Sequence, residues 1–210
     1  MKIMKVVKRP RRLFLFSTML LSGFLLSCST NLPSKSQYYV LNNQVVSELK
    51  YDSEGANTEL ISVIVKELPR YLNQANLVMQ MDEHQLHYSH HHMWAEPLQR
   101  GLTKAFLADL NSLASNRVYV EGYQELSLQV LYLDIERFHV IETSQVSLSG
   151  YYWLATEEKP LPLTKYAFNI TLDLAKDGFS HAVETMRELV SLCAKQIASQ
   201  LDSGKSTLPQ

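Results

Sequence analysis

Glycine and cysteine are both scarce in this chain of 210 residues, which contains seven glycines and two cysteines. The sequence has no glycine-rich phosphate loop, no G-x-S-x-G nucleophile elbow and no H-E-x-x-H helix. Two cysteines also exclude a disulfide-dense scaffold, so packing must stabilise the fold. We therefore expect neither an enzyme nor a bound cofactor.

Two further features of the sequence could suggest catalysis, but neither supports it. Asp134 and Glu136 share one face of a predicted strand, but carboxylates at this spacing are more typical of an exposed stripe than of an acid pair. Cys193 lies on the apolar face of the last predicted helix, where a free cysteine behaves as a small buried hydrophobe. No base stands near it in the sequence, so we predict that neither group is catalytic.

Residues 1–27 have the composition of a secretory signal peptide. The first 12 residues carry six basic and no acidic side chains, and an apolar run of about 14 residues follows, from Leu13 to Leu26. A membrane-spanning helix needs about 20 apolar residues, so a retained membrane helix is the weaker alternative.

The apolar run ends in LLSCST, residues 25–30, which resembles the lipobox of bacterial lipoproteins. The resemblance implies cleavage before Cys28 and its modification with acyl chains such as palmitate; the alternative is a soluble secreted protein in which Cys28 is incidental. Ser29 stands where an aspartate often retains lipoproteins at the inner membrane. The resemblance thus implies the inner leaflet of the outer membrane, facing the periplasm, with residues 28–37 as a lipidated tether.

Removal of the signal peptide changes the charge of the chain. It takes away six of the 20 basic residues and leaves 14 against 21 acidic ones, a net charge of −7. An acidic domain offers no electrostatic footprint for phosphate backbones, so nucleic acid is excluded as a partner. The remaining 183 residues are enough for one domain with a sizeable core.

β-Branched and aromatic residues, often in alternation, predict strands along much of the mature chain. The predicted strands cover residues 38–41, 60–67, 77–81, 85–89, 126–138, 146–154 and 166–174. Within 126–138, apolar residues occupy both even and odd positions. This indicates either a strand buried on both faces or a bulge that switches faces.

Two helices are predicted from apolar residues at spacings of three and four. The first begins at Pro97 and runs to about Ser115, and the second begins with Ser180 as its N-cap. Their apolar stripes are Leu98, Leu102, Ala105, Phe106, Leu110 and Leu113, and Val183, Met186, Val190, Cys193, Ile197 and Leu201. The order of elements predicts an α/β two-layer sandwich, with two main helices on one face of a largely antiparallel or mixed sheet. We expect one domain over residues 38–201 and a disordered tail over 202–210.

Five of the seven histidines fall within residues 84–92. Histidine-rich tracts can bind zinc, and a periplasmic metal-binding lipoprotein is our alternative function. In an extended backbone, however, His90 and His92 point one way and His91 the other, so the run supplies two converging ligands at best. We favour an exposed polar segment that leads into the helix, without a specific metal site.

A series of short motifs follows the cysteine in order: YYVL at 38–41, LPRYL at 68–72, WAEPL at 94–98, ERF at 136–138 and LVSLCAKQIASQL at 189–201. Together they resemble the PqiC-like auxiliary lipoproteins, the ABC-type transport auxiliary component family. The resemblance covers about residues 38–201, and LPRYL and WAEPL are its most specific parts.

This resemblance implies a subunit of an intermembrane lipid-transport system that contains MCE-domain proteins and supports envelope integrity. The implied partner is the periplasm-spanning MCE-domain protein, and assembly into a homo-oligomer is reasonable for the family. The motif residues serve either a structural role or a partner-binding surface: Leu68, Pro69, Arg70, Tyr71, Leu72, Trp94, Ala95, Glu96, Pro97 and Leu98.

Overall fold

The computed structural model describes residues 35–42, 58–122, 129–141, 144–156 and 164–204. The predicted signal peptide and most of the predicted tether lie outside these ranges. The strands in the described residues are β1 (Gln37–Tyr39), β2 (Glu59–Val65), β3 (Asn76–Gln80), β4 (Leu86–Trp94), β5 (Arg117–Glu121), β6 (Gln129–Ile141), β7 (Gln145–Thr156) and β8 (Tyr166–Asp173). The helices are α2 (Leu98–Leu113) and α3 (Phe179–Gly204).

The described strands form one mixed sheet that branches at β6. One edge of β6 pairs antiparallel with β7 along its whole length, and β7 pairs antiparallel with β8. The other edge of β6 is shared: residues 129–133 pair parallel with β2, and residues 140–141 pair parallel with β3. β5 extends the first branch, whereas β4 and then β1 extend the second.

A bulge in β6 returns its apolar side chains to the helical face of the sheet. The register with β7 shifts between Ile135 and Arg137, so Glu136 is the extra residue. Odd-numbered residues from Leu131 to Ile135 and then even-numbered residues from Phe138 to Val140 belong to the same core. The bulge thus changes the phase of alternation between Ile135 and Phe138. Before the bulge, Val130 is also buried, on the face opposite Leu131, so both of the alternatives that the sequence left open contribute to the pattern in β6.

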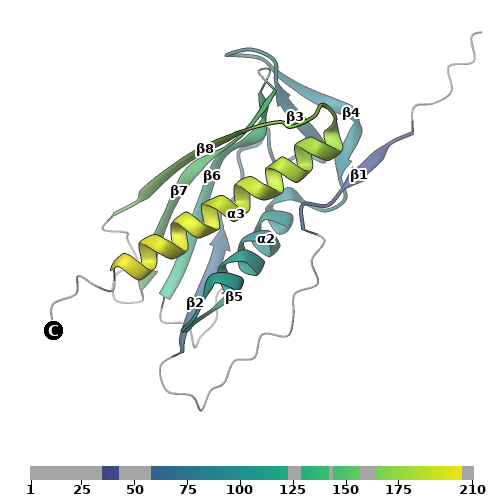
Figure 1. Ribbon diagram of the computed structural model, residues 1–210. Helices are drawn as coiled ribbons and strands as arrows, with labels where there is room; N and C mark the ends of the chain where they lie inside the picture. Colours follow the sequence, from purple (N-terminus) through teal and green to yellow (C-terminus); the bar gives the residue numbers. More distant parts are fainter. Residues whose placement is uncertain (1–34, 43–57, 123–128, 142–143, 157–163, 205–210) are drawn as a thin grey trace, which may run out of the picture. The chain divides into compact units, whose positions relative to one another are not determined.

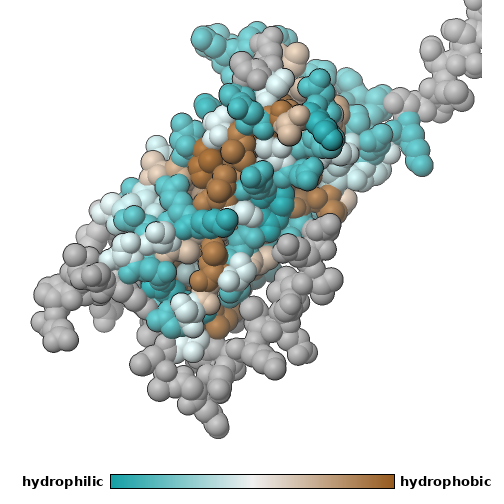
Figure 2. Space-filling model, in the orientation of Figure 1, coloured by the Kyte–Doolittle hydropathy of each residue, from teal (hydrophilic) through white to brown (hydrophobic). Residues whose placement is uncertain are grey.

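Both helices cover the same face of the sheet (Figure 1), which confirms the predicted two-layer arrangement. Their predicted apolar stripes are buried against the sheet, with Phe106, Cys193 and Ile197 all fully inaccessible to solvent. Leu113, at the end of the first stripe, is instead 40% exposed. Figure 2 shows the outward surface of this face as mostly hydrophilic, with a narrow hydrophobic band, as expected for amphipathic helices.

Two arginines join elements that are distant in the sequence. Arg187 on α3 donates two hydrogen bonds to the Asp109 carboxylate on α2, each 2.6 Å long. Arg117 on β5 donates to Glu59, Asp202 and the Leu201 carbonyl, and its side chain is only 6% exposed. These charge-assisted contacts fix the two helices to each other and the end of α3 to the branch formed by β2 and β5.

The structure corrects four expectations. β5 was not predicted from the sequence, although Val118, Tyr119 and Val120 have the β-branched and aromatic composition of a strand. β4 continues well beyond residue 89 and includes the whole histidine run. Helix α3 begins at Phe179, so Ser180 lies in its first turn and is not the N-cap; it also ends at Gly204, so residues 202–204 are helical and not part of the tail.

Among the described helices, none has the length and hydrophobicity that a membrane crossing requires.

Candidate functional site

The LPRYL motif fills the point where the sheet branches. The Pro69 carbonyl accepts hydrogen bonds from the backbone N–H groups of Leu72 and Asn73, which closes a tight turn. Leu68 and Leu72 are buried, at 3% and 2% exposed. The Tyr71 hydroxyl donates a 2.6 Å hydrogen bond to the carbonyl of Glu136, the bulge residue.

The Tyr71 hydroxyl thereby provides a hydrogen-bond partner for a part of the β6 edge that pairs with neither β2 nor β3. This hydrogen bond lies at the surface, so it contributes modestly to stability, but it ties the turn of the motif to the bulge. Burial also raises the pKa of the Tyr71 phenol, so this hydroxyl remains protonated and able to donate. Arg70 is the exposed member of the motif.

The WAEPL motif joins β4 to the first turn of α2. Trp94 is 7% exposed, and its backbone N–H donates to the carbonyl of Ala75. Glu96 accepts a 2.6 Å hydrogen bond from Lys104 and lies 3.7 Å from the Arg100 guanidinium. Pro97 precedes the helix without a side-chain cap, and its carbonyl accepts hydrogen bonds from the next turn. The motif thus anchors one end of α2 to the sheet.

The histidine run occupies the exposed part of β4, but its members differ in environment. His92 is stacked on Phe179, at the start of α3, with ring centroids 3.7 Å apart and an interplanar angle of 12°. The Tyr39 hydroxyl oxygen on β1 lies 2.8 Å from His92 Nδ1. His90 and His91 are exposed, and the ring of His90 contacts that of His87.

His90 therefore contacts His87, whereas His92, which a regular extended backbone would point to the same side as His90, belongs to an aromatic cluster that joins β1, β4 and α3. Aromatic partners so distant in the sequence give no short-range pattern, which is why sequence reasoning missed the cluster. Within the described residues, no group of three or more His, Cys, Asp or Glu side chains is placed to hold a metal ion.

Two buried ionisable side chains, Cys193 and His139, are candidates for a catalytic role. Burial raises the pKa of the Cys193 thiol to about 12, so it is not a nucleophile near neutral pH. Burial, and secondarily the charge of Arg137, lowers the pKa of His139 to about 4. Its Nε2 lies 3.0 Å from the Gln80 side-chain oxygen, and its Nδ1 has no hydrogen-bond partner. Phe138 and Val140 belong to the core together with Cys193, and His139 between them points to the opposite face of the sheet, so the two groups do not form a nucleophile–base pair.

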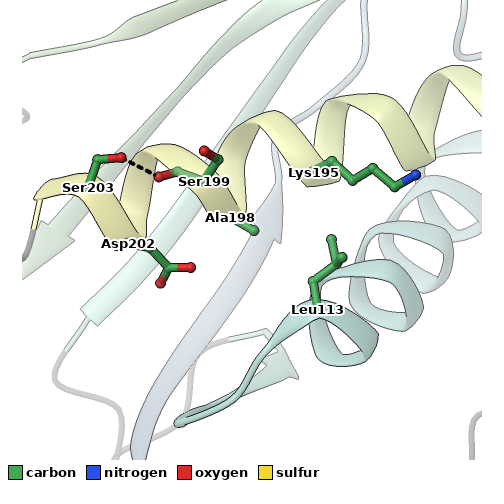
Figure 3. Close-up of a pocket in the computed structure, with 6 residues that line it drawn as sticks. All are labelled: Leu113, Lys195, Ala198, Ser199, Asp202 and Ser203. Carbon is green, nitrogen blue, oxygen red and sulfur yellow. Dashed lines mark hydrogen bonds between the residues drawn. The ribbon is translucent and has the colours of Figure 1, made fainter.

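A surface depression of about 520 Å³ lies between the ends of α2 and α3 (Figure 3). Its lining consists of Leu113, Lys195, Ala198, Ser199, Asp202 and Ser203. The depression is open to solvent, and its Asp202 is already paired with Arg117. This mixture of two apolar side chains, Leu113 and Ala198, and solvated polar groups does not constitute a site for chemistry.

Two comparisons relate this chain to known proteins. The sequence profile of the family described as "ABC-type transport auxiliary lipoprotein component" matches residues 39–198. A crystal structure of an uncharacterised protein superposes with a TM-score of 0.67 at 22% identity, covering 80% of this chain and 99% of that one. A protein from Xanthomonas campestris superposes with a TM-score of 0.63 at 12% identity over the same shares of the two chains. These two likenesses show the fold. No curated protein matches the chain.

Proposed function

Because the chain belongs to the family of ABC-type transport auxiliary lipoprotein components, we propose that it is the outer-membrane-anchored subunit of an MCE-type lipid transporter. The observation that carries the proposal is the extent of the family match, which spans the folded domain from β1 to the last turns of α3. The subunit binds its partner and catalyses no covalent change.

The proposed anchor is Cys28, acylated after cleavage of residues 1–27, with residues 28–37 as its tether. Stable anchoring needs more than one acyl chain, a requirement that the several chains of bacterial lipoproteins meet. β1 begins at Gln37, so the last residue of the predicted tether is already part of the sheet. The proposal therefore places the domain on the periplasmic side of the outer membrane, within reach of a periplasm-spanning MCE-domain protein.

Most residues of the LPRYL and WAEPL motifs have structural roles, so few of them can contact a partner. Leu68, Tyr71 and Trp94 are committed to the core or to the branch of the sheet, whereas the Arg70 side chain is exposed. Ala95 and Pro97 are exposed as well, but Arg70 is the exposed motif residue that carries a charge, and we propose that it contacts a partner. An Arg70→Glu substitution therefore separates partner binding from folding, because it leaves the buried residues unchanged.

The test is capture of the partner. The full-length, lipidated protein is isolated from native membranes in mild detergent, and co-purifying proteins are identified by mass spectrometry. We expect an MCE-domain protein to be recovered, and we expect Arg70→Glu to reduce its recovery without lowering the Tm of the subunit. Recovery of no MCE-domain protein under several mild detergents overturns the proposed function. Unchanged recovery with Arg70→Glu overturns only the role of that residue.

A further inference from the structure

β4 carries a large irregularity at the histidine run. Its pairing with β3 passes from Val78↔Tyr88 to Asn76↔Met93, two residues along β3 but five along β4. Three additional residues of β4 are therefore accommodated between these pairs. Such an insertion breaks the alternation that would otherwise send successive side chains to opposite faces.

The irregularity is held in place by hydrogen bonds at Ser89, which is 5% exposed. The Asn76 side-chain amide donates a 2.7 Å hydrogen bond to the Ser89 carbonyl, and the His92 backbone N–H donates a 3.2 Å bond to the Ser89 hydroxyl. The stacking of His92 on Phe179 fixes the far end of the segment. The backbone around His90 is thus fixed, although the His90 side chain is exposed.

His87 and His90 come together as a result. In a regular strand, residues three apart point to opposite faces, but here the two rings are in edge contact, with centroids 6.3 Å apart and an interplanar angle of 85°. Both side chains are exposed, so each ring can rotate without disturbing the core. His91, the next residue in the run, is also exposed but has no such ring contact with another histidine.

We propose that His87 and His90 form a two-imidazole site for a divalent transition-metal ion, Cu²⁺ or Zn²⁺. Metal–imidazole bonds of about 2.0–2.1 Å place the centroids of two rings bound to one tetrahedral ion about 5 Å apart. The observed 6.3 Å separation needs only a small side-chain adjustment. Water completes the coordination, so the site is an exchangeable one that binds Cu²⁺ more tightly than Zn²⁺.

The test is a calorimetric titration of the full-length protein in detergent, purified without a histidine tag and first stripped of metal with a chelator. We expect one Cu²⁺ to bind per chain. His87→Ala and His90→Ala should each weaken binding by about tenfold or more, because each leaves a single imidazole ligand. The double variant should lose the site.

His91→Ala is the matched control, since it removes an exposed imidazole from the same run and should leave the affinity within about twofold of the original value. Thermal unfolding without metal checks that every variant is folded. Equal losses for His91→Ala and His90→Ala overturn the proposal, because binding would then reflect local histidine density. An absence of binding by the original protein, or unchanged binding by the double variant, also overturns it. Partner capture by the double variant is measured separately, so a failure of this site is distinguished from a failure of the transport function.

Discussion

Histidine illustrates at the level of single residues how one side-chain type acquires three roles here. His87 and His90 are exposed and adjacent, His92 packs between strand and helix, and His139 is 2% exposed within β6. The imidazole ring can serve as a ligand, a flat apolar surface or a buried polar group, depending on which nitrogen atoms have partners. For His139, burial of the ring disfavours the protonated form, and the stability of the protein therefore depends on pH.

We expect His139 to make the protein less stable as the pH falls below 6.5. The folded state keeps this imidazole neutral down to about pH 4, whereas the unfolded chain takes up a proton near pH 6.5. The unfolded state therefore binds more protons between these values, so the contribution to stability is complete above pH 6.5 and declines as the pH falls towards 4. Urea unfolding at pH 7 and pH 5 should show a loss of about 2 kcal/mol from this group.

His139→Gln provides the comparison, because an amide can still donate to Gln80 but does not titrate. Its loss of stability between pH 7 and pH 5 should be smaller than that of the original protein by about 2 kcal/mol. His84→Gln is the control for the substitution itself, since the His84 side chain is 92% exposed and its replacement leaves the core unchanged. Identical pH dependence in the original protein and His139→Gln contradicts the assignment.

Among the elements, β6 and its bulge determine how the sheet is built. The bulge turns the apolar side chains back to the helical face at Phe138, and it exposes the Glu136 carbonyl to the Tyr71 hydroxyl of the LPRYL motif. On its other edge, the β6 backbone comes close to β7 at Gly150. Gly150 faces Ile135, and a Cβ atom at position 150 would lie 2.0 Å from the backbone oxygen of Asp134. Glycine is required there because the neighbouring strand leaves no room for a side chain.

Gly150→Ala should therefore lower the free energy of unfolding by about 3 kcal/mol, since strand backbone would have to move. Gly101→Ala is a matched control in α2, where the new Cβ would meet Leu41 at an ordinary 3.5 Å. There we expect no loss and up to about 1 kcal/mol of gain, because alanine favours the helix over glycine. Denaturant unfolding of both variants measures the difference. Similar effects in the two variants would show that the close approach at the bulge is absent.

Local periodicity accounts for what the sequence predicted correctly at this level. Both helices, their apolar stripes, most strands and the alternatives for residues 126–138 followed from the spacing of apolar residues. The branch of the sheet at β6 did not, because parallel pairing between segments separated by a helix leaves no mark in either segment. The contacts of His92 with Tyr39 and Phe179 and of Arg117 with Asp202 were not predicted either, because the residues in each contact are far apart in the sequence. The motifs were found in advance, but their structural roles depend on these long-range contacts.

At the scale of the whole molecule, the proposed function divides the chain into an anchor and a folded domain. The core of the described domain is built from residues between Leu41 and Ile197 and includes Cys193, which is fully buried. The two cysteines thus have opposite expected chemistry. Cys28 follows the predicted signal peptide and is the proposed acylation site, whereas burial raises the pKa of the Cys193 thiol to about 12 and keeps it unreactive.

Metabolic labelling with palmitate should therefore depend on one cysteine alone. In cells expressing the full-length protein, Cys28→Ala should abolish incorporation of the label and prevent recovery in the outer-membrane fraction. Cys193→Ala should retain both, although removal of a fully buried thiol should lower the Tm because it leaves a small cavity. Label that persists in Cys28→Ala, or disappears in Cys193→Ala, would contradict the assignment of the anchor. Normal labelling with recovery in the inner-membrane fraction would retain the anchor but contradict the proposed outer-membrane location, and with it the docking geometry that the transport proposal requires.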